Sequence, residues 1–136
     1  MSSPMDGPGL AATEKHETTR RTAMRKTQTL IQQLGLKPHP EGGWYRELHR
    51  SPDQVQRQDG AERSALTAIL FLLPANAVSC WHWVIGGDEV WTHIDGATLE
   101  LFQCQGDSQI KCVGLKPGDE LFWQGLDHKQ ALTAWD

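Results

Sequence analysis

The chain has 136 residues, a length that predicts a single domain. It carries 13 Lys and Arg against 17 Asp and Glu, a formal net charge of −4, so it lacks the basic excess that binding to nucleic acid or an anionic membrane requires. Its longest mostly apolar stretch, Ala65–Leu73, falls well short of the roughly 20 residues of a membrane-spanning helix, so we expect no membrane and no nucleic-acid partner.

The N-terminal part divides into a polar leader and one amphipathic helix. Residues 1–21 contain almost no large apolar side chain, so we expect them to be disordered. From Thr22 onward, residues spaced three and four apart fall on one helix face: Ala23, Thr27, Leu30, Ile31 and Leu34. Gly35 predicts the end of this helix, with Leu36 folding back as a hydrophobic contact and Pro38 preventing continuation.

The remainder of the chain is typical of short strands separated by Gly, Pro, Asn and Asp, and residues 22–136 are expected to form one domain. The predicted strands are Gly43–Arg50, Ser64–Leu73, Ser79–Ile85, Glu89–Asp95, Thr98–Cys104, Ile110–Lys116 and Glu120–Trp123. The turn signals lie too close together for helices between the strands. The pattern therefore predicts an antiparallel all-β sandwich or barrel behind one N-terminal helix.

The cysteines indicate the redox environment. Cys80, Cys104 and Cys112 show no CxxC spacing and follow no secretory signal. We expect reduced thiols that pack as small hydrophobic side chains, and a cytoplasmic location.

Two predicted strands on either side of Gly86-Gly87 hold the strongest candidate site. Glu89, Trp91 and His93 share one face of the second strand, and a tight Gly-Gly hairpin would turn His82 of the first strand toward the same interior. His82 and Glu89 are then candidate catalytic acid–base residues. Together with His93 they are also candidate ligands of Fe, Mn, Ni or Zn. The alternative is that both histidines are ordinary sheet residues and that Glu89 is a turn acid.

A second candidate region begins at His39-Pro40. The proline holds His39 extended, and the following glycines permit a tight turn before the next strand. The candidate ligand-binding residues are His39, Glu41, Tyr45, Arg46 and Glu47, together with Trp91. Arg46 suits an anionic group because its guanidinium binds carboxylate or phosphate in bidentate fashion. The alternatives are a purely structural turn and a surface ion pair.

These motifs resemble a known family. The spacing of His82, Glu89 and Gly96 resembles the first cupin motif, with Val84 where that motif has its second His. A closer resemblance is to the cupin 5 family, formerly DUF985, and it is strongest over residues 30–105. Three stretches carry it: His39–Glu47, Ser64–Leu73, and Trp81-His82 followed by Asp88–Trp91.

The resemblance implies an RmlC-like jelly-roll barrel, also called a double-stranded β-helix, with a small-molecule cavity inside it. It also implies a homodimer. The C-terminal half lacks the Val-Pro-Ala-Gly-like turn that the resemblance leads us to expect, so we expect some C-terminal strands of the barrel to be absent.

Three functions stay open at this point, and catalysis itself is among the open questions. The first is a small-molecule-binding protein with sugar or nucleotide-sugar isomerase or epimerase chemistry. The second is a metal-dependent cupin enzyme that uses His82, Glu89 and His93. The third is a noncatalytic binding or structural module with an incomplete barrel.

Overall fold

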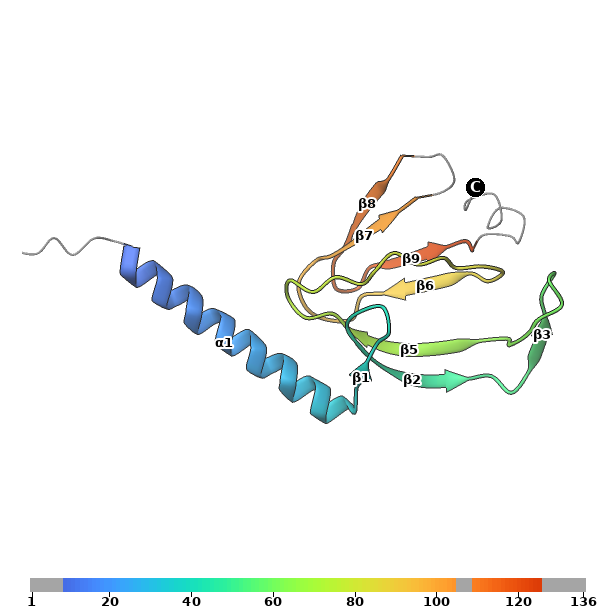
Figure 1. The fold of residues 1–136 in the computed structure, drawn as a ribbon, viewed down its shortest axis with the longest axis horizontal. Coiled ribbons are helices and arrows are strands. Elements are labelled where there is room, and N and C mark those ends of the chain that lie inside the picture. The colour runs from blue at the N-terminus through green and yellow to red at the C-terminus, as the bar shows by residue number, and fades with distance from the viewer. Residues whose placement is uncertain (1–8, 105–108, 126–136) are drawn as a thin grey trace, which may run out of the picture. The chain divides into compact units, whose positions relative to one another are not determined.

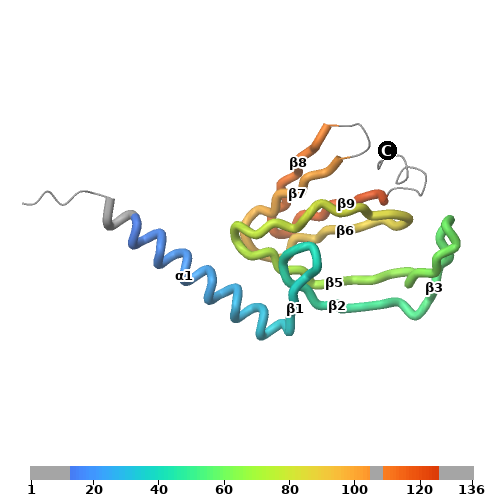
Figure 2. Tube along the Cα trace, viewed as in Figure 1, coloured from blue at the N-terminus to red at the C-terminus, as the bar shows by residue number. Residues whose placement is uncertain are grey.

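The computed structural model describes residues 9–104 and 109–125, shown as a ribbon in Figure 1 and as a Cα trace in Figure 2. These residues form two compact units. The first consists of the described residues up to Asp53 together with Ser64–Trp81, and the second consists of Gln54–Arg63 together with the described residues from His82 onward. One helix and a set of short antiparallel strands make the protein mostly β, as the sequence predicts.

The helix α1 spans Gly9–Leu34, so it begins well before Thr22, and residues 9–21 are helical rather than disordered. Residues 1–8 of the predicted leader lie outside the described residues. No Gly or Pro interrupts the chain after Gly9 until Gly35, and an exposed ion pair joins Glu17 to Arg21 one turn later at 3.4 Å. All side chains from Thr13 to Lys26 are exposed. Local helix propensity therefore accounts for this part of α1, which the absence of apolar residues led us to expect disordered.

The C-terminal end of α1 follows the predicted pattern. Gly35 has φ +61°, its N–H donates to Gln32 O at 3.3 Å, and the N–H of Leu36 donates to Ile31 O at 2.9 Å. These are the two hydrogen bonds of a Schellman motif. Leu36 is only 7 % exposed, which confirms that it folds back as the hydrophobic contact that closes the helix.

The first unit contains a three-stranded antiparallel sheet in the order β1-β2-β5. Its strands are β1 (Lys37–Pro38), β2 (Trp44–Arg50) and β5 (Thr67–Leu72). Trp44 pairs with Leu72 and Arg50 with Thr67, and the register shifts between Glu47 and His49. β2 and β5 lie inside the strands predicted for them.

The turn between β1 and β2 depends on two glycines. His39 N–H donates to Gly43 O at 2.9 Å, and Gly42 N–H donates back to His39 O at 3.1 Å. Gly42 and Gly43 have φ of +111° and +79°, in the region that favours glycine. A Cβ at Gly43 would lie 2.7 Å from Phe71 Cζ, so the turn also needs glycine to pack against β5.

The second unit is built from paired strands. β6 (Glu89–Thr92) pairs with β9 (Glu120–Trp123), and β7 (Leu99–Gln103) pairs with β8 (Lys111–Leu115). The short strands β3 (Gln54–Gln56) and β4 (Glu62–Ser64) form a further pair, which the sequence analysis did not anticipate. The predicted strands at 98–104, 110–116 and 120–123 are therefore present.

Two expectations about the strands differ from the structure. Within Ser79–Ile85, predicted as a strand, only Ile85 makes an isolated bridge, and β6 pairs with β9 instead of with this segment. The Ile85 carbonyl accepts a hydrogen bond from Arg57 Nη2 at 2.7 Å, so a side chain from outside this segment binds its C-terminal end. The described strands also do not close into a barrel, so the jelly roll stays a prediction.

The described residues bury few side chains. Among the residues that the structure describes, Leu36 and Leu115 are the only buried hydrophobic residues. Cys80, Cys104 and Cys112 are exposed, so the expectation that they pack in a core was wrong. Within the same described part of the chain, no helix is both long enough and apolar enough to cross a membrane.

We predict that Gly43→Ala lowers the free energy of unfolding by about 1–3 kcal/mol, because the new methyl group meets Phe71 and the backbone is held at positive φ. Urea denaturation followed by circular dichroism measures the change. Gly87→Ala is the matched control, since a Cβ there has no atom within 4 Å in the described structure and its effect should stay within about 0.5 kcal/mol. Equal effects of the two substitutions would contradict this account of the turn.

Candidate functional site

The predicted site residues fall into two groups, one in each unit. His39, Glu41, Tyr45, Arg46 and Glu47 belong to the first unit. The residues predicted on the two strands beside Gly86-Gly87, His82 and Glu89–His93, belong to the second.

In the second unit, β6 and β9 present one half-buried face and one exposed face. Glu89 is opposite Trp123 and Trp91 is opposite Leu121, and all four of these residues are half-buried. We call these four residues the β6–β9 face. On the other side Val90 is opposite Phe122, and these residues are 53 % and 73 % exposed. The structure thus places Glu89 and Trp91 on one face, as the period of two predicts.

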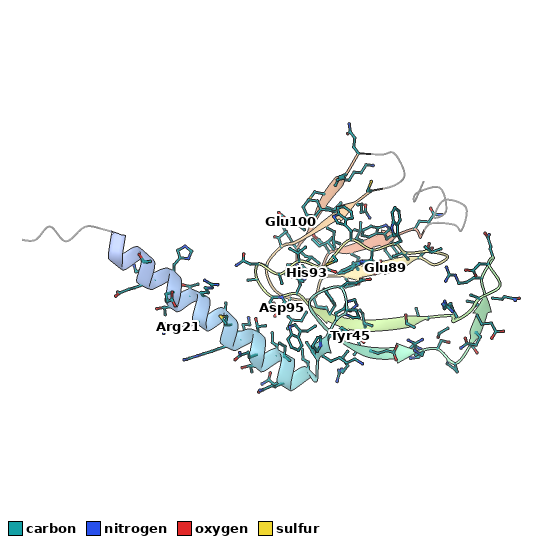
Figure 3. All side chains as sticks on the ribbon, in the orientation of Figure 1. Arg21, Tyr45, Glu89, His93, Asp95 and Glu100 are labelled. Atoms are coloured by element: carbon teal, nitrogen blue, oxygen red, sulfur yellow. The ribbon has the colours of Figure 1, made fainter. Side chains whose placement is uncertain are left out.

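His93 continues this half-buried pattern just beyond β6. Its backbone N–H donates to Asp119 O at 3.0 Å, and its carbonyl accepts from Gly118 N–H at 2.8 Å. Its side-chain Nε2 lies 2.6 Å from the carbonyl oxygen of Ala97. Because a carbonyl only accepts, Nε2 carries a proton, and Nδ1 is then the nitrogen of the neutral ring that can act as a base or ligand. Figure 3 labels His93, Asp95 and Glu89 in this region.

His82 is placed differently from the prediction. It is exposed and lies in the irregular segment before Ile85 rather than on a strand paired with β6. In the described residues, no three His, Cys, Asp or Glu side chains are grouped so that they could hold a metal ion. The described arrangement of His82, Glu89 and His93 therefore does not fit a three-residue metal site, and the metal hypothesis rests on their spacing in the sequence.

In the first unit, His39 lies at the centre of the β1–β2 turn. Its Nδ1 accepts a hydrogen bond from the backbone N–H of Glu41 at 3.1 Å. Its ring makes edge contacts with Tyr45 and Phe71, with centroids 4.9 and 5.5 Å away. The Glu41 carbonyl accepts from Cys80 N–H at 2.7 Å, which ties the turn to the segment after β5. These contacts support a structural part for His39.

The remaining residues of this group lie near the surface. Lys37 Nζ lies 5.1 Å from the centre of the Tyr45 ring, a cation–π contact. Arg46 is exposed. Glu47 accepts from Arg50 Nη2 at 2.6 Å and from Nε at 3.0 Å. The hydrogen bond from Arg50 is the main cause that lowers the pKa of Glu47 below its ordinary value, so the carboxylate already has a cationic partner.

Arg57 and Trp123 were not among the site residues predicted from the sequence. Trp123 lies opposite Glu89 and Arg57 holds the Ile85 carbonyl. Both contacts join positions far apart in the chain. No local motif gives such pairings, although the period of two places Trp123 and Leu121 on the same face of their own strand.

A comparison with known protein families supports this mostly β architecture. Residues 28–123 match the sequence profile of the Cupin superfamily (DUF985) family Cupin_5. The match covers well over half of the chain, and the chain belongs to this family. No curated protein shows a significant match to this chain.

A solved structure extends the comparison. The chain is similar to a hypothetical protein from Leishmania major, with a TM-score of 0.65 and 28 % sequence identity over 72 % of this chain. The similarity covers 64 % of the Leishmania chain, so this chain spans less than two thirds of that protein's length.

We predict that Glu47 titrates below its ordinary pKa and that Arg50→Gln raises the midpoint. Because the folded pKa is the lower one, the pair adds stability above the ordinary glutamate pKa, and this contribution is lost as the pH falls through the lowered value. Carbon-detected NMR of the side-chain carboxyl measures the midpoint. Arg46→Gln is the control, since Arg46 is not among the groups that shift Glu47. A midpoint unchanged by Arg50→Gln would refute the pairing.

Proposed function

We propose that this protein is a small-molecule-binding cupin that binds its ligand on the β6–β9 face. The observation that carries the proposal is the β6–β9 register, which gathers the carboxylate of Glu89 and the indoles of Trp91 and Trp123 on one half-buried face. Membership of the cupin family supports it, since a shared fold raises the expectation of a ligand without naming one.

The chemistry of this face suits a sugar-like ligand. Indole rings offer broad apolar surfaces on which the C–H face of a sugar ring packs, and their N–H groups donate hydrogen bonds. A carboxylate accepts hydrogen bonds from hydroxyl groups, and such bonds to a charged group are the stronger kind. The same three side chains would hold the sugar of a nucleotide-sugar.

The reaction that we propose for this site is an isomerisation or epimerisation of the bound sugar. Such a reaction removes a proton from a carbon next to a carbonyl group and returns it to a different face or position. Glu89 and His82 are the assigned acid–base residues, and each must come within hydrogen-bond reach of the substrate. His93 Nδ1 is the other imidazole nitrogen able to exchange a proton, because Nε2 is engaged with Ala97.

We predict that UDP-glucose binds and that Glu89→Gln weakens its binding by about tenfold or more, because a hydrogen bond to a charged acceptor is lost. Quenching of tryptophan fluorescence and isothermal titration calorimetry measure the affinity. Trp91→Phe should weaken binding less than Glu89→Gln, since an aromatic ring is kept. Thr92→Ala is the matched control, because Thr92 is exposed and lies on the other face of β6.

Three results would count against the proposal. Equal losses in Glu89→Gln and Thr92→Ala would place the ligand elsewhere. Stoichiometric Fe, Mn, Ni or Zn that is lost in His82→Ala would favour the metal-dependent enzyme instead. Failure of UDP-glucose, UDP and glucose to shift the melting temperature would favour a noncatalytic module.

A further inference from the structure

A separate pocket of about 410 Å³ lies within the second unit, where β6 begins and β9 ends. This volume falls within the range of about 300–1,000 Å³ that is typical of small-molecule sites. Residues 55–59, 85–88 and 124–125 line the pocket. None of the four residues of the β6–β9 face is among them.

Among the described residues that line the pocket, Arg57 is the only Lys or Arg, and a hydrogen bond holds its side chain. Its Nη2 donates to Ile85 O at 2.7 Å, and this is the one hydrogen bond of its side chain within the described residues. Its Nε is buried and has no hydrogen-bond partner in that same part of the chain. A guanidinium has several N–H donors, and leaving them unpaired in a half-buried place is unfavourable. Because the buried Nε is closed to solvent, a ligand in the pocket would pair with the Nη donors of the guanidinium.

Gly86 shapes the wall against which the guanidinium packs. A Cβ at Gly86 would lie 2.6 Å from Arg57 Nε and 2.9 Å from Nη2. Its φ of +71° also favours glycine. The Gly86-Gly87 loop, which the sequence predicts as a hairpin turn, therefore leaves room for the Arg57 guanidinium.

Two carboxylates also line the pocket, and backbone N–H groups hold both. Asp59 Oδ1 accepts from Ala61 N–H at 3.0 Å, and Asp88 Oδ1 accepts from Gly125 N–H at 3.3 Å. A Cβ at Gly125 would overlap the carbonyl of Gly87, so the two loops meet backbone to backbone there. The lining thus combines one fixed cation with two acidic groups, and Gln56, Gln58 and Gln124 add neutral polar side chains.

We propose that this pocket binds a small zwitterion that carries both a carboxylate and an amino group. The carboxylate pairs with the Arg57 guanidinium, and the ammonium pairs with Asp88. A phosphate ester suits the pocket less, because it brings a second negative charge close to two carboxylates. A simple cation would leave the Arg57 guanidinium without an anionic partner. The inference goes beyond the proposed function and does not depend on it.

Glycine, β-alanine and γ-aminobutyrate test the proposal on the full chain, because they carry the same two charges at increasing separation. Two-dimensional ¹H–¹⁵N NMR should show saturable shifts of the Gly86, Gly87 and Gly125 amides with at least one of the three. Acetate and methylamine, which carry one charge each, should bind about tenfold or more weakly than that zwitterion.

Two variants remove one charge each. Arg57→Gln and Asp88→Asn should each weaken binding by about tenfold or more. The asparagine oxygen still accepts from Gly125 N–H, so Asp88→Asn tests the charge even if Arg57→Gln disturbs the Ile85 loop. Arg63→Gln is the matched control, since Arg63 is an exposed arginine of β4 outside the pocket lining.

Absence of saturable shifts with all three zwitterions overturns the proposal, and so does undiminished affinity in both variants. Equal binding of acetate and the zwitterions also overturns it, because the ammonium would then contribute nothing. UDP-glucose is tested on the β6–β9 face, so a failure of that probe is distinguishable from a failure here.

Discussion

The register between β6 and β9 is the constraint on which the candidate site depends. Side chains alternate across a strand, so pairing Glu89 with Trp123 and Trp91 with Leu121 decides which residues share a face. A slip of one residue on either strand would exchange that strand's two faces and separate the carboxylate from one of the indoles. Because few of the described residues are buried, backbone pairing rather than core packing determines this arrangement.

Three glycines determine the backbone conformation of two further loops. Gly42 and Gly43 let the β1–β2 turn form while Gly43 packs against Phe71, and Gly86 makes room for the Arg57 guanidinium. In each place the backbone has positive φ and a neighbouring group occupies the space of a Cβ. The conformational requirement and the packing requirement coincide at these positions.

The sequence predicted features that depend on neighbouring residues. The Gly35 helix end, the strands β2, β5 and β9, and the shared face of Glu89 and Trp91 follow from local spacing. Contacts between distant residues were missed, because the pairing of β6 with β9 and the bond from Arg57 to Ile85 leave no local signal. The helix over residues 9–21 was not predicted, because these residues carry few apolar side chains and their helix depends on local propensity.

Nuclear Overhauser effects between β6 and β9 test the register most directly, because directly opposed Cβ atoms lie about 4.5–5.5 Å apart. The account predicts strong contacts between the Trp91 ring and the Leu121 methyls and between Val90 and Phe122. Strong contacts of the Trp91 ring with Phe122 together with contacts of Val90 with Trp123 would show a register shifted by one residue. Contacts of Val90 with Leu121 would show the opposite shift, and either result would contradict the assignment of the β6–β9 face.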